Sequence, residues 1–409
     1  MKEGWELRKL EEVCQIRPSK QEATKIISDS DLVSFLPMKN LGIEQKYVYS
    51  SENKELSSVS SSYTYFQDGD VLLAKITPCF ENGKLGIAKD LTNGIGFGSS
   101  EYVVYRSLEV LNNEFLYYFL SQEDFREKGR TQMQGAVGHK RITKDFYENS
   151  LIPIPPLPEQ KQIVKLLDQA FEAIDQAKAN IEKNIANAKE LFQSKLNDIF
   201  SQKCEGWEEK TLGEVCTIKP QKKLVKEKLK ESDLVSFVPM KYLEVNQMYF
   251  NSEETKTLKE AYSGYVYFEE GDVVLAKITP CFENGKLGIA KDLKNGIGFG
   301  SSEYVIYRVD KDKLSAEFLY FFLNRETFRI KGKSLMSGAV GHKRIQPIFY
   351  ENEIIYLPSL EEQSKILKNI TTVQNSLNKI ESTYNNKLTS LEELKKSILQ
   401  KAFSGELTK

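Results

Sequence analysis

Residues 66–106 read FQDGDVLLAKITPCFENGKLGIAKDLTNGIGFGSSEYVVYR, and residues 268–308 read FEEGDVVLAKITPCFENGKLGIAKDLKNGIGFGSSEYVIYR. The two stretches are identical at 36 of 41 positions and lie 202 residues apart. A hydrophobic core tolerates swaps of similar volume, so packing alone does not require such identity. Because polar residues are shared as well, the repeat indicates either a recent duplication or one recognition surface used twice on a two-fold target.

The duplication extends over the rest of the chain. Residues 31–39 return at 233–241, and the segment GAVGHKRI begins at both Gly135 and Gly338. A period near 200 residues has the size of a domain and not of a solenoid repeat. Each half mixes short apolar strands with Gly, Asn and Ser turns, and we expect one helix at residues 114–128 and its mate at 317–331. This mixture predicts two homologous α+β domains.

A different pattern follows each domain. Residues 151–158 read LIPIPPLP, where prolines exclude a helix, and residues 159–204 contain neither Gly nor Pro. Apolar residues spaced by three and four then indicate coiled-coil seams. The first predicted seam is Ile163, Leu167, Ala170, Ile174, Ala177, Ile181, Ile185, Ala188 and Phe192. The second is Ile366, Ile370, Val373, Leu377, Ile380, Tyr384, Leu388, Leu391 and Leu394. Both seams contain the same step of four after four, so we expect the two long helices to pair antiparallel, with a domain at each end and a pseudo-two-fold relation.

Composition narrows the class of protein. Hydrophobic residues make up 40% and charged residues 28% of the 409, and the net charge is −1. No apolar run approaches the ~20 residues of a membrane helix, and the first residues lack a signal-peptide core, so we expect a cytoplasmic protein without membrane contact. The five cysteines form no CxxC pair, which predicts packing residues and neither disulfides nor a metal site.

Positive charge is concentrated locally. Residues 126–144 contain six Lys or Arg against one acid, and residues 329–344 contain five and no acid. Each segment contains one of the two histidines of the chain, His139 in the first and His342 in the second. Each also contains glycines that allow close approach of a ligand to the backbone. A solvated loop is the alternative to DNA contact. The loop ITPCFENGKLG likewise fits either base or phosphate contacts or a hairpin with an Asn-Gly turn.

Motifs of catalysis are missing from the sequence. Gly83-Lys84 lacks the upstream glycine of a phosphate-binding loop, and NGIGFG at residues 93–98 leads into a strand, unlike a dinucleotide loop. The Asn/Asp-Pro-Pro-Tyr tetrad of amino-methyltransferases is also missing. We therefore expect no catalytic residues, no metal and no cofactor on this chain.

The order of the motifs resembles that of a known family. IPPLPEQ (154–160) and LPSLEEQ (357–363) before the long helices, KAFSGEL (401–407) and the repeated GDVLLAKITPCFENGK resemble type I restriction–modification specificity subunits. The resemblance covers the whole chain. Members of that family usually carry two dissimilar recognition domains, whereas these two are nearly twins.

The resemblance implies a function and a domain plan. It implies target recognition domains at 1–153 and 204–356, linkers with long helices at 154–203 and 357–409, and binding to double-stranded DNA at a bipartite site. Because the two domains are nearly twins, we expect that site to be near-palindromic. Two methyltransferase subunits and restriction subunits are the implied partners, and they would carry S-adenosylmethionine, ATP and Mg²⁺. The DNA contacts placed on matching positions are Lys75, Thr77, Asn82, Lys84, His139, Lys140, Arg141, Lys277, Thr279, Asn284, Lys286, His342, Lys343 and Arg344. The rival hypotheses are a coiled-coil scaffold that does not bind DNA and a stand-alone DNA-modifying enzyme.

Overall fold

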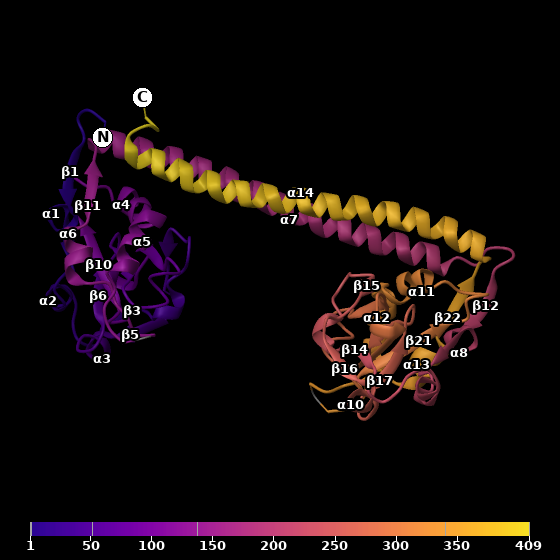
Figure 1. The fold of residues 1–409 in the computed structure, drawn as a ribbon. Coiled ribbons are helices and arrows are strands. Elements are labelled where there is room, and N and C mark those ends of the chain that lie inside the picture. Colours follow the sequence, from indigo (N-terminus) through magenta and orange to yellow (C-terminus); the bar gives the residue numbers. More distant parts are fainter. Residues whose placement is uncertain (1, 51, 137, 340, 409) are drawn as a thin grey trace. The chain divides into compact units, whose positions relative to one another are not determined.

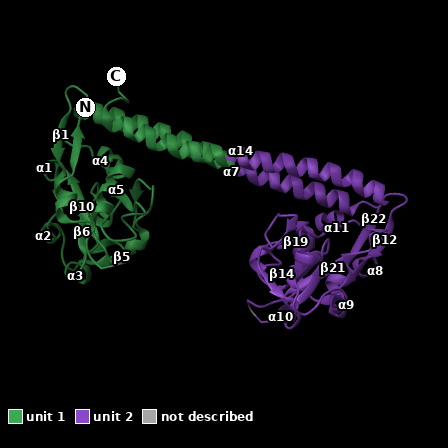
Figure 2. Ribbon diagram, viewed as in Figure 1, with its two compact units in different colours: residues 1–181, 385–409 green, residues 182–384 purple. Residues whose placement is uncertain are grey.

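The chain forms two compact units, Met1–Ile181 with Asn385–Lys409 and Glu182–Tyr384 (Figure 2). The computed structural model describes residues 2–50, 52–136, 138–339 and 341–408. Both units combine small mixed sheets with helices, as the α+β prediction requires (Figure 1). Each unit also contains part of two 45-residue helices, α7 (Leu157–Ser201) and α14 (Leu360–Ser404).

The remaining elements of the first unit occur in chain order. They are β1 (Glu6–Lys9), α1 (Leu10–Val13), β2 (Cys14–Ile16), α2 (Gln21–Thr24), β3 (Leu32–Leu36), β4 (Tyr47–Val48), β5 (Glu52–Glu55), α3 (Leu56–Val59), β6 (Thr64–Gln67), β7 (Val71–Ala74), β8 (Leu85–Ala88), β9 (Ile95–Gly98), β10 (Tyr102–Ser107), α4 (Asn113–Leu120), α5 (Glu123–Thr131), α6 (Lys144–Asn149) and β11 (Leu151–Ile154).

The second unit repeats this order. Its elements are β12 (Glu208–Thr211), α8 (Leu212–Val215), β13 (Cys216–Ile218), α9 (Val225–Lys228), β14 (Leu234–Val238), β15 (Tyr249–Phe250), β16 (Thr255–Thr257), α10 (Leu258–Tyr262), β17 (Val266–Glu269), β18 (Val273–Ala276), β19 (Leu287–Ala290), β20 (Ile297–Gly300), β21 (Tyr304–Val309), α11 (Ala316–Leu323), α12 (Glu326–Ser334), α13 (Pro347–Asn352) and β22 (Ile354–Leu357).

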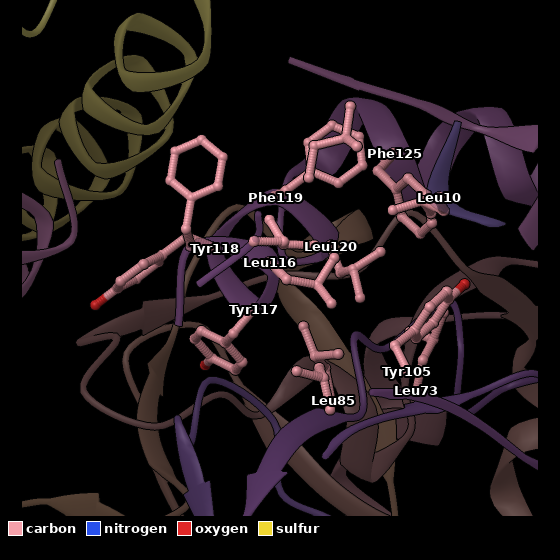
Figure 3. Close-up of a cluster of buried hydrophobic side chains, with 14 of the residues drawn as sticks. Leu10, Leu73, Leu85, Tyr105, Leu116, Tyr117, Tyr118, Phe119, Leu120 and Phe125 are labelled. Carbon is pink, nitrogen blue, oxygen red and sulfur yellow. The ribbon is translucent and has the colours of Figure 1, made fainter. Parts of the chain in front are cut away.

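The repeated stretch supplies the centre of each unit. In the first unit one sheet has the order β2-β10-β7-β8-β4, and a second has the order β5-β3-β9-β6. Successive side chains of strand β7 face opposite sides of the sheet. The strand is buried along its whole length because a core covers each side. Val71 and Leu73 enter the core that contains α4, whereas Leu72 and Ala74 enter the core on the other face. Figure 3 shows Leu85 below Leu116 of α4, and Leu73 close to Tyr105, among the side chains of this core.

The two ends of the repeated stretch are joined by a buried ion pair. Asp70 precedes β7, and its carboxylate accepts hydrogen bonds from Nε and Nη2 of Arg106 in β10, both at 2.8 Å. In the second unit Arg308 donates to Asp272 in the same way, at 2.9 and 2.8 Å. This pairing explains why the identity between the halves includes the charged residues at both ends of the stretch.

Glycines of NGIGFG serve packing. A Cβ built on Gly96 would lie 2.2 Å from the ring of Phe66, and one on Gly98 would lie 2.7 Å from the ring of Tyr102. Both glycines belong to β9, whose residues are all buried. The segment is therefore a strand that passes beneath two aromatic rings, in agreement with the expectation that it is not a dinucleotide loop.

The long helices pair antiparallel within each unit, as predicted. In the first unit Ile163 and Leu167 share a core with Leu399 and Phe403, and further along the helices Lys178 pairs with Glu392. In the second unit Lys189 pairs with Glu381 at 2.9 Å. Phe192 of α7 shares a core there with Ile370 and Leu377 of α14. The placement of a domain at each end and the pseudo-two-fold relation stay predictions.

Several details of the prediction were wrong. Val373, Ile380 and Leu394 were assigned to the second seam but are exposed, and Lys395 takes the inward position beside Leu394. The helix expected at residues 114–128 is interrupted after Leu120, and its mate at 317–331 is interrupted after Leu323, so each forms two helices.

The loop 75–84 joins the antiparallel strands β7 and β8, as in the hairpin alternative, and DNA contact by this loop stays a prediction. One further expectation differs from the structure. Cys204 is exposed and is not a packing residue, although Cys14 and Cys216 are buried. Among the residues described, no helix combines the length and the hydropathy needed to cross a membrane.

A buried glutamine connects each long helix to its domain. Gln160, in the LPEQ motif, accepts a hydrogen bond from the Asn112 amide at 2.8 Å and donates to the carbonyl oxygens of Val110 and Pro155, each at 2.8 Å. Gln363 makes the corresponding three bonds in the second unit. The motif therefore orients the helix against the loop that precedes α4.

Replacing Gln160 with leucine should lower the free energy of unfolding of the first unit by about 2 kcal/mol. The substitution leaves one amide and two carbonyl groups without their partner, and each buried unsatisfied group costs about 1–3 kcal/mol, partly offset by burial of the leucine. Urea unfolding of the full chain measures the change. The matched control is Gln162→Leu on an exposed face of the same helix, which should change stability by no more than about 0.5 kcal/mol.

Candidate nucleic-acid interface

Two loops of the first unit are bonded to each other. We name residues 75–84 the proline loop and the described residues 134–136 and 138–141 the basic loop. The Thr77 amide donates to the Lys140 carbonyl at 2.9 Å, and the Lys140 amide donates to Oγ1 of Thr77 at 3.1 Å. The Ile142 amide donates to the Lys75 carbonyl at 3.0 Å. The proposed contact residues Lys75, Thr77, Lys140 and Arg141, which are far apart in sequence, thus lie on one surface.

Arg141 is held by a carboxylate that the sequence analysis missed. Its Nε and Nη2 donate to the two oxygens of Glu101 at 2.9 and 2.8 Å, and its Nη1 donates to the His139 carbonyl at 3.1 Å. The hydrogen bond from Arg141 lowers the pKa of Glu101, and the charges of Lys75, Arg141 and Arg17 lower it further. Glu101 is therefore the anionic centre of a cluster of three cations. Its position inside the identical GSSEY segment was the available signal.

Two of the proposed lysines have backbone partners. Lys75 donates to the Ser100 carbonyl at 2.9 Å, and burial lowers the pKa of its ammonium group. Lys84 donates to the Met38 carbonyl at 2.8 Å. Both side chains therefore hold loops in place, and their contact with DNA stays a prediction.

The remaining proposed residues point a polar group toward solvent. His139, Lys140 and Asn82 are exposed. The Asn82 amide donates to the Pro78 carbonyl at 2.9 Å, and the residue also lines a groove beside α5 and the long helices. Among the described residues, no hydrogen bond or ion pair joins Asn82 to the basic loop. In the basic loop itself, Gln134, His139, Lys140 and Arg141 are exposed.

The second unit builds the same arrangement from the same residue types. The Thr279 amide donates to the Lys343 carbonyl at 2.9 Å, and the Lys343 amide donates to Oγ1 of Thr279 at 3.1 Å. Arg344 donates to both oxygens of Glu303 at 2.9 and 2.8 Å. Lys277 donates to Ser302, Lys286 donates to Met240, and Asn284 and His342 are exposed. The two units therefore present equivalent loops.

The local positive charge is smaller than the sequence count indicated. In the first unit Arg130 pairs with Glu127 at 2.8 Å, Lys144 lies 3.6 Å from Glu148, and Arg141 pairs with Glu101. In the second, Lys331 pairs with Glu353 and Lys333 with Glu283. Glu127 is the acid already counted, whereas Glu101, Glu148, Glu283 and Glu353 lie outside the counted segments, so the count missed them. Of the lysines in these two segments, Lys128, Lys140 and Lys343 have no acidic partner among the described residues.

The described residues contain no group of three or more His, Cys, Asp or Glu side chains that could hold a metal ion. The loops instead offer hydroxyl, ammonium, imidazole and guanidinium groups, and hydrogen bonds join the two loops. Such groups donate hydrogen bonds to phosphate oxygens and base edges.

Comparison with known proteins gives one family. The model of the type I restriction modification DNA specificity domain matches residues 2–187 and again residues 204–390. The specificity subunit of the type I restriction enzyme EcoAI of Escherichia coli is 36% identical over 175 residues, or 42% of this chain and 29% of that subunit. In that alignment the chain spans less than a third of the relative. The MjaVIII specificity subunit of Methanocaldococcus jannaschii is 23% identical over 99% of this chain and 93% of its own length.

Solved structures share the fold. A chain from work on complex assembly and conformational transition of the type I R-M system has a TM-score of 0.78 at 20% identity, and the match covers 99% of both chains. The HsdS subunit of Thermoanaerobacter tengcongensis has a TM-score of 0.64 at 20% identity over 99% of this chain and 98% of that one. Since the family model matches most of both halves, the chain belongs to the type I restriction modification DNA specificity family.

Proposed function

We propose that this chain is a sequence-specific DNA-binding specificity subunit of a type I restriction–modification complex. The observation that carries the proposal is the joined pair of loops, with the same exposed Lys and His, in each of two domains that match a DNA specificity family. Loops that carry ammonium and imidazole donors are suited to phosphate and base edges. Each domain would read one half of a bipartite site.

The reaction chemistry belongs to other subunits in this proposal. Two methyltransferase subunits and restriction subunits dock on the chain and supply S-adenosylmethionine, ATP and Mg²⁺. The methyltransferase subunits act on an adenine that leaves the duplex. This chain contributes DNA recognition and the spacing of the half-sites, and it has no catalytic residue of its own. We place the complex in the cytoplasm.

The near identity of the two domains sets the expected target. Equivalent loops should read equivalent bases, so the two half-sites should be the same or differ at few positions. Differences between the domains lie mainly outside the repeated stretch, for example in residues 50–65 and 251–267. These segments are where a departure from a palindrome would arise.

Mapping modified adenine in cells that express the chain with its neighbouring methyltransferase tests the proposal. We expect one interrupted motif with matching halves, and no such motif when this chain is deleted. Two unrelated half-sites would contradict the symmetric reading while leaving DNA recognition intact. Methylation unaffected by deletion would favour a scaffold, and methylation or cleavage by the purified chain alone would favour a stand-alone enzyme.

A further inference from the structure

The two units attach their globular domains to the long helices through different chemistry at equivalent positions. One part of the attachment is the same in both. Phe403 packs against Phe115 and Phe119 with ring centroids 4.8 and 5.6 Å apart, and Phe200 packs against Phe318 and Phe322 at 4.9 and 5.6 Å. The buried glutamines described above lie at this same part of the junction. The aromatic contact and the glutamine therefore form a fixed point in each unit.

Away from the fixed point, the first unit relies on ion pairs. Lys46 of the domain lies 2.8 Å from Asp168 of α7, and Glu44 lies 2.7 Å from Lys395 of α14. A third pair joins Glu123 of α5 to Lys396 at 2.8 Å. At least one partner in each pair has a side chain more than 40% exposed. Ion pairs in such surroundings contribute little, because water and salt screen them.

The same ion pairs border an open groove within the first unit. The groove has a volume of about 850 Å³. Its walls come from the domain, from α7 and from α14, and they include Tyr117, Tyr118, Phe171, Asp168, Lys395 and Lys396. Across the groove, Tyr118 of α4 packs edge-on against Phe171 of α7 with ring centroids 5.6 Å apart, and its hydroxyl donates to Asp168. One aromatic contact therefore joins the walls beside the ion pairs.

In the second unit, apolar packing and neutral hydrogen bonds replace these pairs. By the repeat, Lys395 corresponds to Phe192, which is buried in the core, and Lys46 corresponds to Met248, which packs against that core. Lys396 corresponds to Gln193, whose side chain accepts a hydrogen bond from the Glu326 amide at 2.8 Å. Asn197 of α7 also accepts a hydrogen bond from Thr327 of α12 at 2.7 Å. Salt does not screen close packing or neutral hydrogen bonds as it screens ion pairs.

We propose that the first unit contains a salt-sensitive hinge and that the second unit does not. The first globular domain rocks about the Phe403 and Gln160 contacts, and the ion pairs of Lys46, Lys395 and Lys396 open and close the groove. The corresponding domain of the second unit stays fixed on its helices. A chain with near-identical loops would then hold one recognition domain rigidly and the other adjustably.

Distances between spin labels in the full chain test the hinge. Cysteines at Ser57 and Asn180 report on the first unit, and cysteines at the equivalent Lys259 and Thr383 report on the second, in a chain with Cys79, Cys204 and Cys281 changed to serine. All four labelled positions are exposed. We expect the first pair to give the broader distance distribution. It should widen about twofold as salt rises from about 0.1 M to about 1 M, where the Debye length falls from about 10 Å to about 3 Å. The second pair should not respond.

A transplant of residues supplies the matched variant. Glu44→Asn, Lys46→Met, Asp168→Thr and Lys395→Phe together give the first unit the residues of the second. This variant should give a narrow distribution that does not change with salt. The proposal is overturned if the unmodified first unit is as narrow and as insensitive to salt as the second. It is equally overturned if the folded transplant keeps the original breadth.

Discussion

Replacing Asp70 with alanine is expected to lower the free energy of unfolding of the first unit by about 3–5 kcal/mol, the range for removing one partner of a buried ion pair. The Asp70 side chain is only 1% exposed, and its carboxylate binds Arg106 through two hydrogen bonds. It also accepts the Gln67 amide at 2.9 Å. Without it, a guanidinium that stacks near Tyr65 loses its buried anion. Urea or thermal unfolding of the full chain measures the loss.

Two comparisons make this result specific. Glu22 pairs with the same Arg106 from a side chain that is 32% exposed, so Glu22→Ala should cost no more than about 1 kcal/mol. Asp272→Ala should destabilise the second unit by an amount similar to that of Asp70→Ala in the first, because Arg308 binds it in the same way. A loss below about 1 kcal/mol for Asp70→Ala would show that the ion pair is not a main support of the fold.

The repeat is why so much of the fold could be predicted from the sequence. Because residues 66–106 recur at 268–308 with their polar residues intact, the stretch is expected to form the same structural element in each half. The strand-rich character of each half followed from its short apolar segments, and the antiparallel pairing of the long helices followed from the matching irregular step of the two seams. The family resemblance carried by the same motifs was confirmed by the match of the specificity model to both halves.

What failed were features decided by partners distant in sequence. Apolar spacing placed Leu394 in the seam, but Lys395 lies inward because Glu44 and the ring of Phe171 receive its ammonium group. Helical periodicity also predicted α4 and α5 as one helix. The structure interrupts that helix after Leu120, where Arg126 donates a hydrogen bond to the Ser121 carbonyl. A count of cations overlooked Glu101 for the same reason: the sequence does not state which acid folds next to which base.

Glu101 leads to the second large expected effect. Glu101→Gln and Arg141→Ala should each weaken binding of the assembled complex to its site by about tenfold to a hundredfold, the equivalent of about 1–3 kcal/mol. The reason is that Arg141 uses three nitrogen atoms within the chain, two on Glu101 and one on the His139 carbonyl. We therefore expect Arg141 to act by positioning the basic loop. Binding titrations of the complex on the mapped site measure the change.

A double-mutant cycle separates positioning from base reading. If Arg141 positions the loop, the double variant should bind no worse than either single variant, because both remove one interaction. If Arg141 reads a base, Arg141→Ala should relax specificity at one base pair while Glu101→Gln preserves it. Lys140→Ala serves as the control: an ammonium that contacts only phosphate should lower the salt slope by about one without altering base preference. The equivalent Glu303→Gln should act on the other half-site, which links each basic loop to the bases it governs.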